Sequence, residues 1–266
     1  MEVVDVNALL FADDLKLFME ISSPKDSLKL QSSLIAVEEW CKGNNMSVNP
    51  GKCSVVTFHR IKSPILYSYF ISNSEIPRLL NVTDLGVCFS SDMGFTEHLN
   101  IICSKANKML GFISRFSRGI NNPSALRSLY CSLVRQLLEY ASPVWSHYTV
   151  GAGTRLEALQ RRFIRLVGVR IGYNYPDVPV EALTAELNIP TLSLRRDVAD
   201  VLMLWKLVGA HVQCPDLLAE IGIRIPVNTR WAFQPQVPLH ELRLQQSTGK
   251  ICSPGEPCCI RVRFFR

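Results

Sequence analysis

Apolar and polar residues at the start of the chain follow the pattern of a β-hairpin. Residues 3–21 contain two apolar runs, and Ala12, Asp13 and Asp14 lie between them. Short runs rich in β-branched and large apolar residues favour strands, and Asp is common in turns. The pattern therefore predicts two strands joined by a tight turn that carries two adjacent carboxylates.

A helix with a clear start follows the predicted hairpin. Ser23 is placed to act as its N-cap, Pro24 takes the first helical position, and Asp26 comes three residues after the cap. Gly43 then marks the end of the helix. In between, apolar residues recur at helical spacing, at Leu30, Leu34, Val37 and Cys41.

The pattern changes twice more along the chain. Residues 53–58 predict a strand, and residues 64–89 predict a β-meander with a turn at 72–74. Helical spacing then predicts four helices in succession: one from Thr96, one from Pro123 to before Pro143, one over about 154–167 and one over 191–210. Beyond Pro226 the sequence is proline-rich and predicts an irregular tail.

These elements together predict an α+β fold with two main parts. Residues 1–92 hold the hairpin, the first helix and the meander, and residues 93–225 form a mainly helical region. Residues 226–266 are expected to form an irregular or disordered tail.

Composition narrows the class of protein. Apolar residues make up 47% of the 266 residues and charged residues 20%, which is typical of a folded globular chain. The longest apolar stretch contains Asp200 and Lys206 and is therefore a poor membrane span. The first residues lack the basic segment with which a signal peptide begins, so we expect an intracellular protein, nuclear or cytoplasmic. In that environment most of the nine cysteines are expected to be reduced.

Positive charge is concentrated in one part of the chain. The formal net charge is only +6, but the stretch 105–170 contains just two acids, Glu139 and Glu157. A block of one sign suits contact with phosphate groups. We expect nucleic-acid contacts from eight of its basic residues: Lys105, Lys108, Arg115, Arg118, Arg155, Arg161, Arg162 and Arg165.

Several motifs occur in an order that resembles one family. They are FADD at 11–14, NPGKC at 49–53, LGVCF at 85–89, and two later segments, 129–145 and 155–169. This ordered set is similar to the reverse transcriptase of non-LTR (LINE-type) retrotransposons, especially the jockey-like group. The resemblance covers the chain up to about residue 240. It implies the end of a polymerase palm followed by a thumb-like helical region.

The resemblance also implies roles for particular residues. Asp13 and Asp14 would hold Mg²⁺, with Asp13 as the direct ligand, and Lys52 would donate a proton to the leaving pyrophosphate. Leu85 and Gly86 would support the end of the primer. The implied substrates are an RNA template, a DNA primer and deoxynucleoside triphosphates. Phosphoryl transfer of this kind requires two metal ions held by carboxylates.

Other parts of the family's active site are not found in the sequence. The family takes a further metal-binding aspartate and a Pro-Gln-Gly segment from positions upstream of the hairpin, whereas this sequence begins six residues before Asn7. We therefore expect the chain alone to bind Mg²⁺ weakly or not at all and not to polymerise DNA. We also expect the hairpin to keep an unpaired edge with exposed apolar surface.

Three alternatives remain open at this point. The chain could be a non-catalytic basic module that binds nucleic acid, or a relic or truncated gene product. Asp13 and Asp14 could also form an ordinary polar turn. A zinc site built from the late cysteines and histidines is disfavoured, because Cys258 and Cys259 are adjacent and no Cys-x-x-Cys pair is present.

Overall fold

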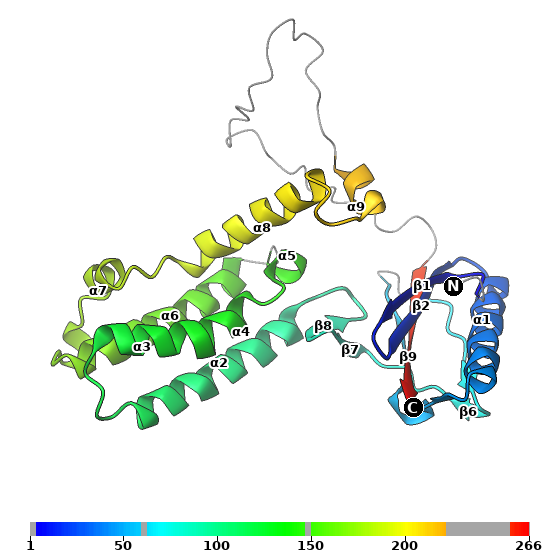
Figure 1. Ribbon diagram of the computed structural model, residues 1–266, viewed down its shortest axis with the longest axis horizontal. Helices are drawn as coiled ribbons and strands as arrows, with labels where there is room; N and C mark the ends of the chain where they lie inside the picture. Colours follow the sequence, from blue (N-terminus) through cyan, green and yellow to red (C-terminus); the bar gives the residue numbers. More distant parts are fainter. Residues whose placement is uncertain (1–3, 60–62, 147–149, 222–255, 266) are drawn as a thin grey trace, which may run out of the picture. The chain divides into compact units, whose positions relative to one another are not determined.

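The computed structural model describes residues 4–59, 63–146, 150–221 and 256–265, and its elements are drawn in Figure 1. The fold mixes helices with small antiparallel sheets. The described residues divide into two compact units, which are treated separately below. One unit comprises residues 4–101 together with the strand at 256–265, and the other comprises residues 102–221.

The predicted hairpin is confirmed in the first unit. Strand β1 (Asn7–Phe11) pairs with β2 (Asp14–Ile21), and the tight turn between them contains Ala12 with φ 52°. Leu15 and Leu17 of β2 are completely buried, so β2 anchors the turn to the core. A rigid strand at this position holds the two carboxylates at one end of the sheet.

The predicted helix is also confirmed, as α1 (Pro24–Gly43). The backbone N–H of Ser23 donates a 2.7 Å hydrogen bond to the Asp26 carboxylate, which stabilises the first turn. The apolar stripe predicted from the sequence is buried, at Leu30, Leu34, Val37 and Cys41. This stripe packs with β2 into the core of the unit.

The last strand of the chain lies inside the main sheet. Strand β9 (Glu256–Phe265) runs antiparallel between β2 on one side and β3 (Ser47–Val48) and β4 (Ser54–Thr57) on the other. In its register Ile260 is opposite both Leu17 of β2 and Val55 of β4. These two neighbours are 0% and 1% exposed, so β9 crosses the centre of the sheet.

Strand β9 corrects one sequence expectation. Residues 256–265 are a strand rather than an irregular tail, whereas residues 222–255 and 266 lie outside the described part of the chain. Strand β9 pairs with β2, and among the described residues no strand pairs with the other side of β1. The unpaired edge and the exposed apolar surface expected of the hairpin are therefore found on β1, where Leu9, Leu10 and Phe11 are 57%, 55% and 65% exposed.

The predicted β-meander forms two separate ribbons. Strands β5 (Phe70–Ile71) and β6 (Ser74–Glu75) pair around a turn at Ser72–Asn73, which confirms the predicted turn. Strands β7 (Asn81–Asp84) and β8 (Val87–Ser90) pair around Leu85–Gly86. Among the described residues these pairs are not joined into one sheet.

The second unit is helical. The helices predicted from the sequence are all present: α2 (Thr96–Phe116), α3 (Pro123–Tyr130) continued through a π-helical turn (Cys131–Arg135) into α4 (Gln136–Glu139), α6 (Val150–Arg170), and α8 (Leu192–Val208). The first residues of α2, up to Ile101, belong to the sheet-containing unit. Three shorter helices were not predicted: α5 (Ser142–Trp145), α7 (Val180–Glu186) and α9 (Pro215–Glu220).

Long side chains fill the interior of the helical unit. Tyr130 and Phe163 stack with ring centroids 4.3 Å apart, and both are completely buried. None of the described helices has the length and apolar character that crossing a membrane requires.

Candidate nucleic-acid interface and carboxylate turn

The two carboxylates of the FADD motif differ in their surroundings. Asp13 is exposed at the tip of the hairpin turn, whereas Asp14 is half-buried as the first residue of β2. Because side chains alternate along a strand, Asp14 and Lys16 share the face opposite the completely buried Leu15 and Leu17. Asp14 therefore points away from the apolar core.

Strand β9 brings a basic residue to the register position of Asp14. Asp14 is paired with Arg263, and Lys16 is paired with Arg261. The register concerns the backbone, and it shows which residue type β9 supplies at this position. At this end of the sheet the adjacent strand thus contributes arginine and not a third carboxylate.

Lys52 lies at the same end of the sheet by register. It ends a short 3₁₀ turn (Pro50–Lys52), in which the Asn49 side chain accepts a 3.0 Å hydrogen bond from the Gly51 N–H. The turn joins β3, in which Val48 is paired with Phe264, to β4, in which Ser54 is paired with Arg261. It therefore follows the part of β9 that pairs with the start of β2, and β9 lies between this turn and Asp14.

Leu85 and Gly86, the residues expected to support a primer, are connected to the same sheet by an ion pair. Leu85 and Gly86 form the turn between β7 and β8 with φ 44° and 85°, and Leu85 is 46% exposed. Asp84, just before the turn, forms an ion pair with Lys16 of β2. The structure therefore connects the Leu85–Gly86 turn to the strand that begins with Asp14.

The donor set at the turn does not fit a two-metal centre. Within the described residues no group of three or more His, Cys, Asp or Glu side chains gathers to hold a metal ion. Asp13 and Asp14 are two hard oxygen donors of the kind Mg²⁺ prefers, but two ions about 4 Å apart need further carboxylates. Of the late cysteines and histidines, His240 and Cys252 lie outside the described residues.

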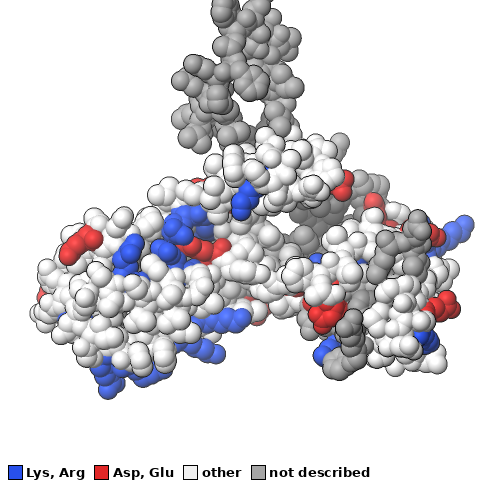
Figure 2. Space-filling model, viewed as in Figure 1, with Lys and Arg blue, Asp and Glu red and all other residues white. Residues whose placement is uncertain are grey.

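The basic residues expected to bind nucleic acid form two groups in the helical unit. Three exposed cations lie on α2, at Lys105, Lys108 and Arg115, and Arg118 is exposed two residues beyond its end. Lys108 and Arg115 are seven residues apart and therefore share a face of the helix. Figure 2 shows Lys and Arg side chains spread along the lower edge of this unit, with few acidic side chains among them.

Helix α6 places further cations beside α2. The Arg162 guanidinium donates a 2.8 Å hydrogen bond to the Asn107 side chain, and Arg170 donates one of 2.6 Å to the Ser114 carbonyl. Burial raises the pKa of the Cys103 thiol, and the nearby positive charge of Arg155 partly offsets that shift. Arg155 and Arg162 therefore lie along the seam between α6 and α2.

Arg161 and Arg165 form the second group, on another face of α6. Arg161 is exposed, and Arg165 lies over the ring of Tyr175 at 5.6 Å from its centroid. Consecutive residues point about 100° apart around a helix, so Arg161 does not share the direction of Arg162. The basic stretch of the sequence thus covers more than one face.

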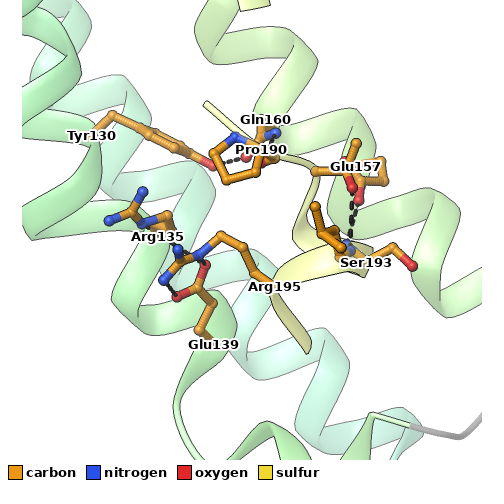
Figure 3. A network of polar contacts seen from close by, with 10 residues as sticks. Tyr130, Arg135, Glu139, Glu157, Gln160, Pro190, Ser193 and Arg195 are labelled. Atoms are coloured by element: carbon orange, nitrogen blue, oxygen red, sulfur yellow. Dashed lines mark hydrogen bonds and ion pairs between the residues drawn. The ribbon is translucent and has the colours of Figure 1, made fainter. Parts of the chain in front are cut away.

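The two acids of the basic stretch are used inside the helical unit, as Figure 3 shows. Glu139 receives hydrogen bonds from Arg195 of α8, including one of 2.8 Å from Nη2. Glu157 accepts a 2.9 Å bond from the backbone N–H of Ser193, in the first turn of α8. Both carboxylates therefore face α8, and they do not neutralise the cations along the seam of α2 and α6.

Sequence reasoning missed two parts of these sites. It did not identify Arg263 as the residue in register with Asp14, although residues 260–264 alternate apolar and basic residues as a strand does. It also did not separate Arg162 from Arg161, because the contact with Asn107 depends on how two helices pack. Comparison with protein-family models, with curated proteins and with solved structures found no match to the chain.

Proposed function

We propose that this chain binds single- or double-stranded nucleic acid through the phosphate backbone and is a non-polymerising segment of the reverse transcriptase type. The proposal combines the order of motifs in the sequence with the charge distribution of the helical unit. The basic seam of α2 and α6, defined by Lys108, Arg115, Arg155 and Arg162, is the contact surface in this proposal. The RNA template and DNA primer of such enzymes are the implied ligands.

The observation that carries the proposal is the separation of charges within residues 105–170. The two acids of this stretch bind to α8, whereas Lys108, Arg115 and Arg155 are exposed. Surface cations release counterions from a nucleic acid when they bind its phosphates. This is the main source of affinity in binding that does not depend on sequence.

The carboxylate turn supports a binding role over catalysis by the chain alone. Among the described residues, no third side chain that could bind a metal ion lies with Asp13 and Asp14. The residue in register with Asp14 on the neighbouring strand is Arg263 and not a third carboxylate.

A salt titration tests the binding proposal. Fluorescence anisotropy with labelled RNA, DNA and RNA–DNA duplexes should show an affinity that falls linearly with salt concentration on a double-logarithmic plot. Each phosphate contact contributes about −0.9 to that slope on duplex DNA. An affinity that does not change with salt would contradict the proposal.

Charge reversal locates the surface. The double variant Lys108→Glu/Arg115→Glu should lose most of the affinity and reduce the slope by about 2, because two phosphate contacts are removed. Lys25→Glu/Lys29→Glu on α1 makes the same change in net charge at two exposed residues of the other unit. Equal losses in the two double variants would show that net charge, and not the seam, determines binding.

A further inference from the structure

One helix of the second unit exposes its more apolar face. Helix α8 carries six large apolar residues that are between 47% and 58% exposed: Leu194, Val198, Val201, Leu202, Trp205 and Val208. Figure 1 shows α8 at the margin of the helical layer. We call these six residues the α8 face.

The opposite side of α8 makes the contacts within its own unit. Leu192, Arg196 and Leu207 are buried there, and Arg195 binds Glu139 of α4. An amphipathic helix normally buries its apolar stripe and leaves its polar side in water. Here a buried arginine side chain faces the unit, and the more apolar stripe faces outward.

The spacing of the α8 face is that of a helix–helix seam. Leu194, Val198, Val201, Trp205 and Val208 follow one another at intervals of 4, 3, 4 and 3 residues. This is the heptad spacing with which two helices pack side by side. The seam extends over about 21 Å of helix axis.

The size of the face matches what an association between two copies requires. Six large side chains about half exposed present on the order of 500 Å² of apolar surface, at the upper end for a monomeric protein. Two such faces in contact would bury on the order of 1,000 Å² in total, which is about the minimum area of a specific interface. A second copy also supplies a helix whose seam has the same length and spacing.

The margins of the α8 face permit this pairing. No charged side chain belongs to the face, and its exposed charged neighbours are one acid, Asp197, and one base, Lys206. Arg195 is already paired with Glu139. Bringing two copies together therefore adds no net like charge at the interface.

We propose that the chain forms a homodimer in which the α8 faces of two copies pack against each other. The occupant of the face is thus a second copy of this chain. The dimer places two helical units side by side, so each dimer would carry two basic seams.

Sedimentation of the full-length chain over a range of concentrations tests the dimer. The expected result is a reversible monomer–dimer equilibrium that Val201→Lys shifts toward monomer by at least about tenfold in Kd, because a lysine would be buried in an apolar seam. Val169→Lys is the matched control. It makes the same change at a valine of α6 that is 42% exposed, compared with 47% for Val201.

Other outcomes would overturn the proposal. A wild-type chain that stays monomeric at every concentration would do so, since the α8 face would then be covered by other means or left in water. A dimer that Val201→Lys leaves intact would place the interface elsewhere. Val198→Lys provides a second variant beside the centre of the seam, and far-UV circular dichroism confirms that each variant keeps its helices.

Discussion

At the scale of single residues, the helical unit is held by a few buried polar contacts. The completely buried Tyr130 hydroxyl donates a 2.9 Å hydrogen bond to Gln160 Oε1, and Gln160 Nε2 donates one of 3.0 Å to the Pro190 carbonyl. This chain of bonds connects α3, α6 and the segment that leads into α8. Burial raises the pKa of the Tyr130 phenol far above its ordinary value.

Tyr130→Phe should therefore change both the stability and its dependence on pH. The variant leaves Gln160 Oε1 without its donor and should lower the free energy of unfolding by about 1–2 kcal/mol at neutral pH. In the wild type the phenol stays neutral when folded but ionises when unfolded above about pH 10, so stability falls as the pH rises beyond that value.

Chemical denaturation followed by far-UV circular dichroism at a series of alkaline pH values measures both effects. Tyr130→Phe should lose part of the alkaline decline in stability. Tyr173→Phe, at a tyrosine that is 44% exposed, should keep the full decline and the neutral-pH stability of the wild type. If the two variants behave alike, the buried phenol does not determine the alkaline behaviour.

At the scale of elements, local sequence patterns predicted most helices and the first hairpin but not their partners. The spacing of Leu30, Leu34 and Val37 specifies both the helix α1 and the face that it buries. For α8 the same kind of pattern predicts the helix correctly. However, the side of α8 that packs against its own unit contains Leu192 and Leu207, whereas the more regular apolar stripe is exposed. The packing of neighbouring helices decides which face is covered, and this is not encoded in a local period.

Strand β9 shows the same limit for sheets. The alternation in residues 260–264 indicates a strand, yet its partners β2 and β4 are about two hundred residues earlier in the sequence. Nothing in the local pattern identifies a partner at that separation. The register that places Arg263 opposite Asp14 could therefore not be predicted.

Ile260→Pro should disrupt the sheet-containing unit. Proline has no backbone N–H to donate, and β9 is paired on both sides, so the substitution breaks the ladder at its centre and should cost about 2–4 kcal/mol. Hydrogen exchange should show lost protection of the Leu17 amide in β2, while the amides of α6 remain protected. The Val55 amide donates to the Pro77 carbonyl and not to β9, so it reports on the sheet less directly. Glu256→Pro, at the first residue of the strand, is the tolerated control, and equal loss in both variants would contradict the central position of β9.

At the scale of the whole molecule, the two units carry different parts of the proposed function. The sheet-containing unit presents the carboxylate turn, and the helical unit presents the basic seam and the α8 face. Because the donor set at the turn does not fit two metal ions, we expect binding to nucleic acid without extension of a primer.

A primer-extension assay with the purified chain, a primed RNA template, deoxynucleoside triphosphates and Mg²⁺ checks this expectation. No product should form above that of an Asp13→Asn/Asp14→Asn variant, which serves as the background. Extension by the wild type that this variant abolishes would show that the chain assembles a working metal centre after all, and the interpretation of the turn would be wrong.

The place of β9 in the sheet also bears on how the protein is made. A ribosome completes β8 at residue 90 and must then synthesise the whole helical unit before it reaches residue 256. Domains fold during synthesis as their residues emerge, so the helical unit can fold before the strand that pairs with β2 and β4 has been synthesised. Until residues 256–265 have been synthesised, the edges of β2 and β4 that pair with β9 have no partner in the nascent chain. Chaperones that bind exposed apolar strands would bind there.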